Sequence, residues 1–538
     1  MTTRAQTRDH KLIGLATVVR LALRRDRLSL TSWVIGFGLF TLYVVVAIPA
    51  AYGDEADMRA TADLFAVPMS RVLIGPAYGF ENPSFEQFVT NGYGLYFLLL
   101  AALMSILTMI RHTRAEEQTE RAELLRSNAV GRHATLTAAL IMTGVANVLS
   151  TAAVVAVLLF VGEYSIEGSL LFGAGIAATG LSFAGIAAVT AQLSEFSRGA
   201  SGLAGIVLGA AFVIRAGGDL AAVGGSTLSW FSPLAWAQQT APFVLNRWWP
   251  LALPLILAMV TCAMGFALSA VRDFGASHFQ ARLGPGHAPS RWGHPWGWAW
   301  RQQRSLTIAW AGSLIVGSLA FGGFTQALLE AELPEVFRQL FTSVDLLTGY
   351  LAYMVTFMAF FVSSFAVMAV QGLRSEESTT RLEAILALPV SRSRWFLAQL
   401  GVTTLVTAVM LLVIGWSIGV GAALVTRDWS LVLDLGWAQL SYLPAVGVVL
   451  AVAALLFGTL PRLVPATWAL VALSVFLGSF GTLLDLPQFV LNLSPFTHLA
   501  EMPIEKFNAW AAMVLSGISL AGVGIGVLGL RRRDVSGG

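Results

Sequence analysis

The stretch R-A-E-E-Q-T-E-R-A-E-L-L-R-S-N-A-V-G-R at residues 114–132 returns 260 positions later as R-S-E-E-S-T-T-R-L-E-A-I-L-A-L-P-V-S-R at residues 374–392. Each copy follows one long apolar run and precedes another. Identical residues occupy these aligned pairs of positions: Arg114/Arg374, Glu116/Glu376, Glu117/Glu377, Arg121/Arg381, Glu123/Glu383, Val130/Val390 and Arg132/Arg392. The repeat predicts a short charged helix at a membrane face in each of two similar halves of the chain.

The local pattern of each copy is helical. In the second copy three apolar residues fall at positions i, i+3 and i+4 and form one stripe for burial: Leu382, Ile385 and Leu386. Glu117 and Arg121 lie four residues apart with the acid first, as do Glu377 and Arg381, which is the better orientation for a helical ion pair. A single copy is compatible with a solvated linker, but two copies at matching places favour a docking surface.

The composition is that of a polytopic α-helical membrane protein. The chain has 538 residues, of which 56% are hydrophobic and 12% are charged, and its mean hydropathy is +0.72. Its apolar residues come in runs of roughly 20 or more, the length of a transmembrane helix. A β-barrel would show alternating segments of about ten residues instead. The single cysteine, Cys262, excludes an internal disulfide and a cysteine-cluster metal site.

Twelve apolar runs are predicted to span the membrane, at residues 30–50, 88–110, 134–161, 169–193, 199–217, 250–271, 306–328, 348–372, 395–424, 436–460, 464–484 and 508–530. Twelve spans place both termini on one side. If the chain starts inside, the outer segments hold few of the 33 Lys and Arg, namely Arg59, Arg71, Arg215, Arg247, Arg338, Arg427 and Lys506. This asymmetry follows the positive-inside rule. We therefore predict a multi-pass plasma-membrane protein with cytoplasmic termini, whose basic residues face lipid rather than nucleic acid.

The repeat extends beyond the charged stretch. The sequence R-R-D-R-L-S-L-T-S-W at 24–33 is echoed by R-Q-Q-R-S-L-T-I-A-W at 301–310. Arg198 matches Arg462, and the dipeptide Ser-Pro at 232–233 matches Ser-Pro at 494–495. Because both halves begin on the same side, we predict two parallel six-helix repeats related by an axis along the membrane normal.

These features divide the chain into predicted segments. Residues 1–29 form a cytoplasmic amphipathic helix, retained rather than cleaved as a signal, with residues 10–27 lying in the membrane interface. The first six-span half covers 30–271 with a coupling segment at 111–133. The second covers 306–530 with a coupling segment at 373–394, followed by a cytoplasmic tail at 531–538. Between the halves, 272–305 is a Gly-, Pro- and Trp-rich linker with a second amphipathic helix, and its His287 and His294 lack carboxylate partners for a metal.

Several kinds of chemistry are excluded by the sequence. The two lysines, Lys11 and Lys506, are both outside any G-x-x-x-x-G-K-[ST] loop, so the chain is not itself a P-loop ATPase. The match to G-x-S-x-G at residues 415–419 falls inside the predicted span 395–424 rather than at a strand-to-helix turn, so it does not indicate a catalytic serine. An ion-coupled antiporter needs an ionisable group near the midplane of a span, and the sequence shows none. Arg215 is predicted to snorkel and to pair with Asp219 rather than to contact a substrate.

The pattern E-x-x-x-R-L-E-x-x-L-x-x-P-V-S-R at residues 377–392 resembles the coupling segment of ABC-2 type exporter permeases. The first half carries a weaker version, with Asn128 and Ala129 where the second has Leu388 and Pro389. A fused twelve-span chain of this length is similar to the actinobacterial polyketide-antibiotic exporters, including tetronasin-type integral membrane proteins. The resemblance implies that a separate dimer of ATP-binding subunits, carrying ATP and Mg, docks beneath the permease.

The resemblance also assigns candidate site residues. The ATPase-coupling residues would be Arg114, Glu116, Glu117, Arg121, Glu123, Arg132, Arg374, Glu376, Glu377, Arg381, Glu383 and Arg392, with secondary contacts at Arg198 and Arg462. In this family the first, second and fifth spans of each half line the substrate pathway, which here brings in Tyr93, Tyr96, Phe97, Met104, Tyr350, Tyr353, Phe357, Phe360, Phe361, Phe476 and Phe480. No catalytic or metal-binding residue is expected.

The function implied is efflux of hydrophobic or amphiphilic compounds such as antibiotics, since aromatic and Met side chains form adaptable apolar pockets. Two alternatives stay open. A twelve-span secondary drug antiporter would need a proton-carrying carboxylate within the membrane. A membrane-embedded lipid- or sugar-modifying enzyme would need acids or histidines clustered at one interface.

Overall fold

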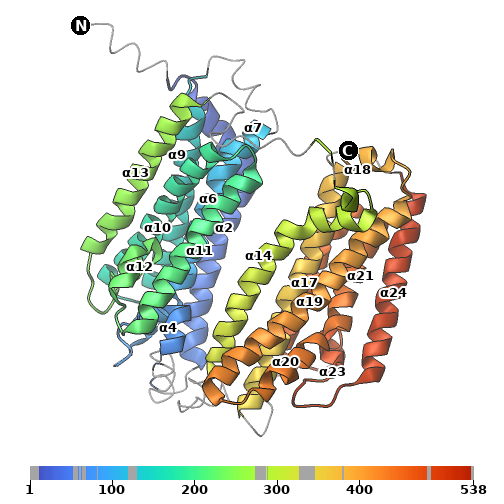
Figure 1. Ribbon diagram of the computed structural model, residues 1–538. Coiled ribbons are helices and arrows are strands. Elements are labelled where there is room, and N and C mark those ends of the chain that lie inside the picture. The colour runs from blue at the N-terminus through green and yellow to red at the C-terminus, as the bar shows by residue number, and fades with distance from the viewer. Residues whose placement is uncertain are drawn as a thin grey trace. The chain divides into compact units, whose positions relative to one another are not determined.

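The computed structural model describes residues 11–51, 59, 62, 68–81, 83–118, 130–272, 286–287, 289–325, 346–378, 381–481 and 486–534. Within these ranges every regular element is helical. They contain twelve helical stretches long and apolar enough to cross a membrane, which confirms the predicted fold class and number of spans. The chain divides into two compact units, residues 1–283 and 284–538, at a boundary inside the linker region (Figure 1).

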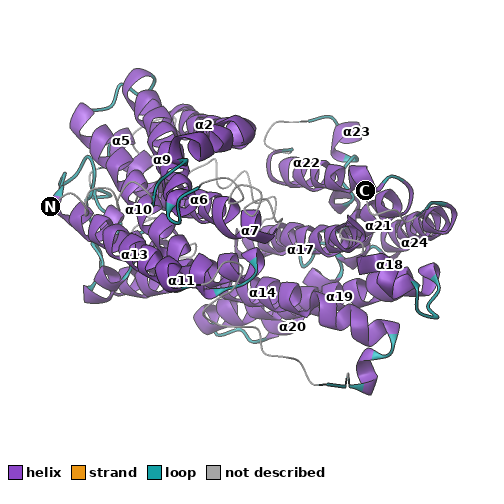
Figure 2. Cartoon of the chain, turned by 90° about the horizontal axis from the view of Figure 1, so that it is seen from above, coloured by secondary structure: helices purple, strands orange, loops and turns teal. Residues whose placement is uncertain are grey.

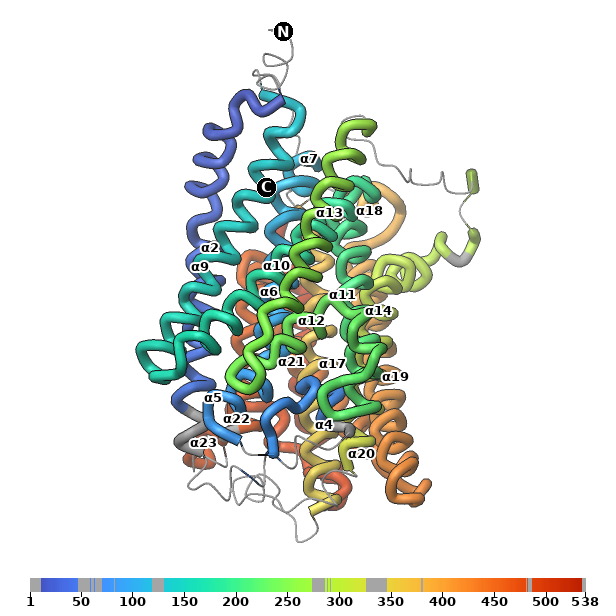
Figure 3. The backbone as a smooth tube through the Cα atoms, turned by 90° about the vertical axis from the view of Figure 1, so that its left-hand side faces the viewer, coloured from blue at the N-terminus to red at the C-terminus, as the bar shows by residue number. Residues whose placement is uncertain are grey.

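The first unit is a bundle built around one small-residue helix. Its six spanning stretches are α2 (Leu15–Ala51), a composite stretch from Phe85 to Gln118 that includes α6 (Tyr93–Ile110), α9 (Ala134–Phe160), α10 (Ile166–Leu193), α11 (Ser197–Ala221) and α13 (Ala252–Val271). Helix α10 packs against α6, α9, α11 and α13, and α2 runs along α9 (Figures 2 and 3). The many glycines and alanines of α10 allow these close approaches.

The second unit repeats this order of helices. Its spanning stretches are α14 (Pro295–Gly323), α17 (Leu346–Ser378), α19 (Arg392–Thr426), α20 and α21 (Ser430–Leu440 and Leu443–Thr459), η6 and α22 (Pro461–Ala466 and Thr467–Phe480) and α24 (Ala509–Arg532). Helix α14 packs along α19 as α2 does along α9, and α21 packs against α17 and α24 as α10 does against α6 and α13. The same pairs of spans are therefore in contact in both units.

Each unit starts with a longer helix than the sequence predicts. Residues 10–27 and the first span were expected as separate helices, yet α2 continues unbroken through both for 37 residues. The physical reason is that no Gly or Pro interrupts residues 15–35, and arginines are good helix formers that do not end a helix. Helix α14 likewise begins at Pro295, a favoured first position, and continues into its span.

Short helices replace plain loops at the ends remote from the charged repeat. They are α4 (Pro68–Ile74), α5 (Phe85–Gln87), η3 (Thr227–Phe231), α12 (Pro233–Gln238), η4 (Trp249–Leu251), α23 (Gln488–Leu491) and η7 (Phe496–His498). Ser232 caps α12 by accepting a hydrogen bond from the Leu234 amide, with Pro233 at the first helical position. Most of the predicted connection at 329–347 lies outside the described residues.

The contact between α21 and α24 depends on glycine at the point of closest approach. A Cβ atom added to Gly526 would lie 2.6 Å from the Ala454 carbonyl oxygen, whereas one added to Gly524, two residues earlier, would meet nothing within 4 Å. Backbone atoms cannot move aside as a flexible side chain can, so a larger residue at 526 must separate the two helices.

We therefore predict that Gly526→Val lowers the free energy of unfolding by about 1–3 kcal/mol or more. Thermal unfolding of the detergent-purified chain, followed by size-exclusion chromatography, measures the effect. Gly524→Val is the matched control on the same helix and should unfold at nearly the parent temperature. Equal stability of the two variants would contradict the close packing of α21 on α24.

Candidate functional site

The charged repeat of the first unit forms a buried ion cluster. The Glu117 carboxylate, in α7 (Glu116–Gln118), lies 2.7 Å from the Arg114 guanidinium and 2.6 Å from that of Arg272, which follows α13. Arg114 is only 1% exposed, and its Nε donates to the Ala191 carbonyl oxygen of α10. One carboxylate therefore joins the end of the second span to the end of the sixth. We call Arg114, Glu117 and Arg272 the first charge clamp.

The second unit repeats the cluster at equivalent positions. Glu377, at the end of α17, is 1% exposed and accepts hydrogen bonds at both carboxylate oxygens from Arg533, which follows α24; the Nη2–Oε2 distance is 2.9 Å. Arg374 lies 3.4 Å from the same carboxylate. Arg533 also donates to the Phe457 carbonyl oxygen at 3.2 Å and stacks over the Phe457 ring. We call Arg374, Glu377 and Arg533 the second charge clamp.

The last arginine of each repeat binds the same helix end. Arg132 donates to the carbonyl oxygens of Ser269 and Arg272 at 3.3 and 3.4 Å. Arg392 donates to those of Leu530 and Arg533 at 3.5 and 2.7 Å. A cation there satisfies carbonyls left free at a helix C-terminus and opposes the helix dipole. The second, third and sixth spans of each unit are thus joined by one polar cluster.

The structure corrects one predicted ion pair. Glu377 and Arg381 were expected to pair at i, i+4, but Arg381 lies 3.3 Å from Glu376, and Glu377 faces Arg533 instead. A buried carboxylate is stabilised by cations that donate hydrogen bonds to it, and Arg533 donates two. Arg381 is exposed, so an ion pair with it would be weakened by solvent. The other predicted pair, Glu117 with Arg121, cannot be placed, because Arg121 lies outside the described residues; the predicted coupling residue Glu123 lies outside them too.

Helix α18 and the residues that follow it carry solvent-facing side chains of the second repeat. Helix α18 (Arg381–Leu386) buries Leu382 and partly buries Ile385 and Leu386, so the predicted apolar stripe is confirmed. Arg381, whose side chain is 62% exposed, Glu383 and Leu388 face outward. We call Arg381, Glu383 and Leu388 the exposed motif face. A partner that docks on this surface contacts these side chains rather than the Glu377 carboxylate.

The remaining predicted coupling residues are placed as follows. Glu116 forms an ion pair with Arg25 of α2, and Glu376 pairs with Arg381. Arg198, in the first turn of α11, and Arg462, in η6, are both exposed on the short turns between the fourth and fifth spans of their units. Their coupling role stays a prediction, since the structure contains no partner chain.

A second polar cluster near this end was not predicted. Asp26 of α2 is buried and lies 2.7 Å from the Arg111 guanidinium and 2.9 Å from His112 Nε2. In the second unit the aligned residue is Gln303, whose side chain donates to Gln399 Oε1 at 2.9 Å and accepts from Thr403 at 3.0 Å. The sequence does show this difference between the units: in the aligned stretches R-R-D-R and R-Q-Q-R, Asp26 aligns with Gln303.

The predicted pathway residues, ten aromatics and Met104, divide into buried and accessible groups. Four are buried among their own unit's helices: Phe97, Met104, Tyr350 and Phe360. The Tyr350 hydroxyl donates to the Phe321 carbonyl oxygen at 2.7 Å, and Phe360 packs edge-on against Phe496. Six are partly or fully exposed: Tyr93, Tyr96, Tyr353, Phe357, Phe361 and Phe476. The side chain of Phe480 lies outside the described part.

Three of the accessible aromatics form a column along α17. Tyr353 stacks on Phe357 with ring centroids 6.1 Å apart, and Phe357 meets Phe361 edge-on at 5.2 Å. The i, i+4, i+8 spacing puts all three on one face of the helix. This column is the most continuous aromatic surface among the predicted pathway residues that the structure describes, and its role in transport stays a prediction.

Arg215 was expected to snorkel and to pair with Asp219; the structure shows that it is buried, so the first part of this prediction is wrong. Its side chain and that of Asp219 are both 0% exposed and lie 3.2 Å apart, so the predicted ion pair is confirmed. The Ser229 hydroxyl donates to Asp219 at 2.7 Å, and Arg71 Nε donates to the Asp219 carbonyl oxygen at 2.7 Å. Residue spacing could not show that α4 and η3 enclose this pair.

Comparison with known proteins agrees with this layout. The family model described as multidrug efflux system permease Rv1217c, C-terminal domain, matches residues 15–268 and 293–531, which leaves out the linker between the two units. The multidrug efflux system permease protein Rv1217c of Mycobacterium tuberculosis (strain ATCC 25618 / H37Rv) is 36% identical over 542 residues, covering 99% of this chain and 97% of the relative.

The charge clamp predicts that Glu377→Gln lowers the free energy of unfolding by about 3–5 kcal/mol, because two arginines then lose their buried counter-charge. Detergent-solubilised protein heated in steps and analysed for residual monodisperse material measures the loss. Arg381→Gln removes an exposed charge and should stay within about 0.5 kcal/mol of the parent. A Glu377→Gln protein as stable as the parent would show that the clamp is not structural.

Proposed function

The chain belongs to the multidrug efflux system permease Rv1217c family, and from that premise we propose that it is the membrane-spanning permease of a multidrug efflux system powered by a separate ATPase subunit. The observation that carries the efflux function is the 36% identity to a named efflux permease over nearly the whole of both chains. The substrates proposed are hydrophobic or amphiphilic compounds such as antibiotics. The Arg-rich end of each unit is proposed to face the cytoplasm.

The ATP requirement is inferred from what the chain lacks and from what it repeats. The sequence has no phosphate-binding loop, so energy from ATP must reach it through a contact with another chain. The charged stretch occurs once per half, which fits two ATPase subunits docking as a dimer that carries the ATP and Mg. The exposed motif face is the surface that we propose the ATPase contacts in the second unit.

The geometry of the clamp supports a mechanical role for this contact. Glu377 is the penultimate residue of α17, and the exposed motif face begins three residues after α17 ends. The carboxylate is held by Arg533 beyond α24 and by Arg374 on α17 itself. A displacement of α18 is therefore transmitted to two spans together, as expected of a rigid-body switch rather than of a flexible tether.

One observation favours the alternative of an ion-driven antiporter, namely buried Asp26 beside His112. Arg111, 2.7 Å away, argues against it, because the Asp26 carboxylate already has a cationic partner within the protein. Affinity purification of the chain from its own membranes separates the two functions. Co-purification of a P-loop ATPase chain supports the proposal, and efflux by the purified chain alone on a proton gradient overturns it.

Charge reversal on the exposed motif face tests the docking surface. Arg381→Glu should reduce ATPase co-purification and drug resistance at least tenfold while leaving the protein folded, because its side chain makes one exposed ion pair. Lys506→Glu, an exposed cation that precedes α24 at the end remote from α18, is the control and should retain both. Undiminished resistance and co-purification in Arg381→Glu would remove this face from the interface.

The aromatic column tests the proposed pathway. Tyr353→Ala with Phe357→Ala should lower resistance to hydrophobic drugs several-fold, because the apolar surface that the substrate contacts is lost. Phe489→Ala, on the exposed helix α23, should have no such effect. Equal membrane abundance by immunoblot is the condition for comparison. Unchanged resistance in the double variant would exclude the column from the pathway.

A further inference from the structure

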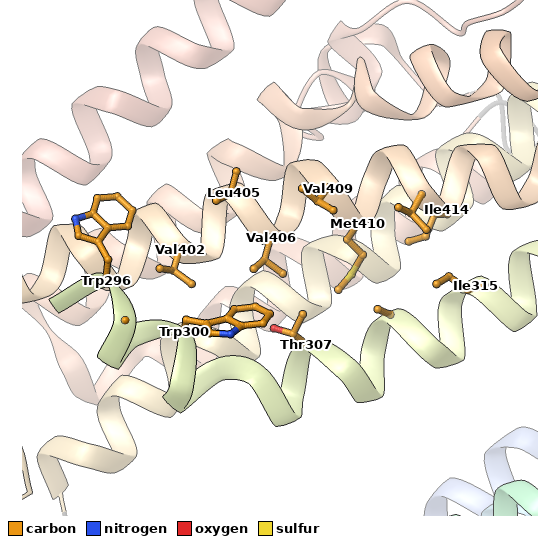
Figure 4. A pocket seen from close by; sticks show the side chains of 13 residues that line it. Trp296, Trp300, Thr307, Ile315, Val402, Leu405, Val406, Val409, Met410 and Ile414 are labelled. Carbon is orange, nitrogen blue, oxygen red and sulfur yellow. The ribbon is translucent and has the colours of Figure 1, made fainter. Parts of the chain in front are cut away.

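An apolar groove of about 600 Å³ lies between α14 and α19 in the second unit. Trp296, Trp300 and Thr307 line it from α14, and Val402, Val406 and Met410 are among the residues that line it from α19 (Figure 4). Its volume is in the range of small-molecule sites, roughly 300–1,000 Å³. Because only two helices line it, an occupant reaches it from outside the unit rather than from a sealed interior.

Contacts between α14 and α19 at one end of the groove hold the two helices apart. Trp296 lies directly on Gly401 of α19, since a Cβ added there would sit 2.3 Å from the indole ring. Glycine thus lets the ring lie against the backbone at one end of the groove. Beside it, the Gln303 side chain donates to the backbone and side-chain oxygens of Gln399, and Thr403 donates to Gln303. The Gln399 side chain in turn donates to Gln302 on α14. These contacts fix the spacing of α14 and α19 without filling the space between them.

Two arginines, Arg304 and Arg394, lie near the end of the groove that contains Trp296 and Trp300. Arg304 follows Trp300 by four residues and precedes Thr307 by three, so it is on the groove-lining face of α14. Arg394 lies eleven residues before Leu405, which also lines the groove, and so is about three turns along the same face of α19. Both arginines are exposed, and neither has an ion-pair partner among the residues that the structure describes. Tryptophans with such cations are typical of the headgroup layer of a membrane.

A cavity among α2, the second span and α9 of the first unit has different chemistry. The cavity there is about 330 Å³ and includes Asp26, Arg111 and His112 in its lining. The acid and Arg111 already form an ion pair, so the charge of this cavity is satisfied internally. The aligned counterpart of Arg304 is Arg27, which is also exposed but stands beside this polar cavity. The apolar groove and this first-unit cavity therefore differ in the chemistry of their linings.

We propose that the groove binds an anionic phospholipid of the leaflet at the Arg-rich end, with an acyl chain between α14 and α19 and the phosphate between Arg304 and Arg394. The apolar lining matches the acyl chain, and the two exposed cations beside it match an anionic headgroup. This inference goes beyond efflux, since α19 is not among the spans proposed to line the drug pathway. The bound lipid would hold the first and third spans of the second unit as one body.

Photo-crosslinking of the purified full-length chain in nanodiscs tests the proposal. Phosphatidylglycerol and phosphatidylcholine analogues with the same photoreactive tail are compared, and labelled peptides are identified by mass spectrometry. We expect preferential labelling of α14 and α19 peptides by the phosphatidylglycerol analogue. Combined Arg304→Gln and Arg394→Gln should lower that preference about tenfold. Val406→Trp, which fills the groove, should abolish labelling by either lipid.

Arg27→Gln is the matched control, because it removes the aligned arginine from the first unit, beside the polar cavity, and its labelling of α14 and α19 should equal the parent's. Elution as a single size-exclusion peak verifies that each variant is folded. Equal labelling by the two analogues, or labelling unaffected by the Arg304→Gln and Arg394→Gln pair, would overturn the proposal. Displacement of the label by a neutral lipophilic dye but not by unlabelled phosphatidylglycerol would instead identify a drug site and overturn the lipid assignment.

Discussion

A carboxylate held between two guanidinium groups organises the charged end of each unit; it is partly buried in the first unit and buried in the second. Such a carboxylate is unfavourable unless cations reach it, and here the cations come from the same helix end and from the residue following the unit's last span. Glu117 and Glu377 therefore dictate where Arg272 and Arg533 must lie. The arginine at the start of the third span completes the arrangement by binding the carbonyls of that same terminal helix. Three spans are held in register by contacts that the apolar faces alone could not specify.

The clamp also separates two roles that one short motif combines. In the second unit Arg374 and Glu377 pair within the protein, while Arg381 and Glu383 of α18 face solvent. These contacts would let α18 transmit a displacement to the attached spans, because the ion pairs hold its base in place where a flexible loop would not. The proposed partner would thus act on spans that are already tied together.

The two units share their packing but differ in what they place within it. The first ends its second span in a π-helical turn, η2 (Arg111–Ala115), whereas α17 continues as a regular α-helix through the aligned residues. Asp26 with its cations faces one cavity, and an amide network borders an apolar groove in the other. At the opposite end the first unit buries Arg215 with Asp219, while around Ser494 the second relies on aromatic contacts of Phe496 with Phe360 and Tyr442. Duplicated helices have kept their contacts while their polar interiors diverged.

The sequence by itself determined the membrane class, the number of spans, the repeat and the apolar stripe of α18, because run length, spacing and helical periodicity are local quantities. It also placed Arg215 next to Asp219, a pair within one helical turn. Only the tertiary structure decided that Glu377 pairs with Arg533 rather than Arg381, that Arg215 is enclosed, and that Asp26 faces Arg111. Those partners are separated by scores of residues, and which charge a helix buries depends on the helices folded around it, which no local pattern encodes.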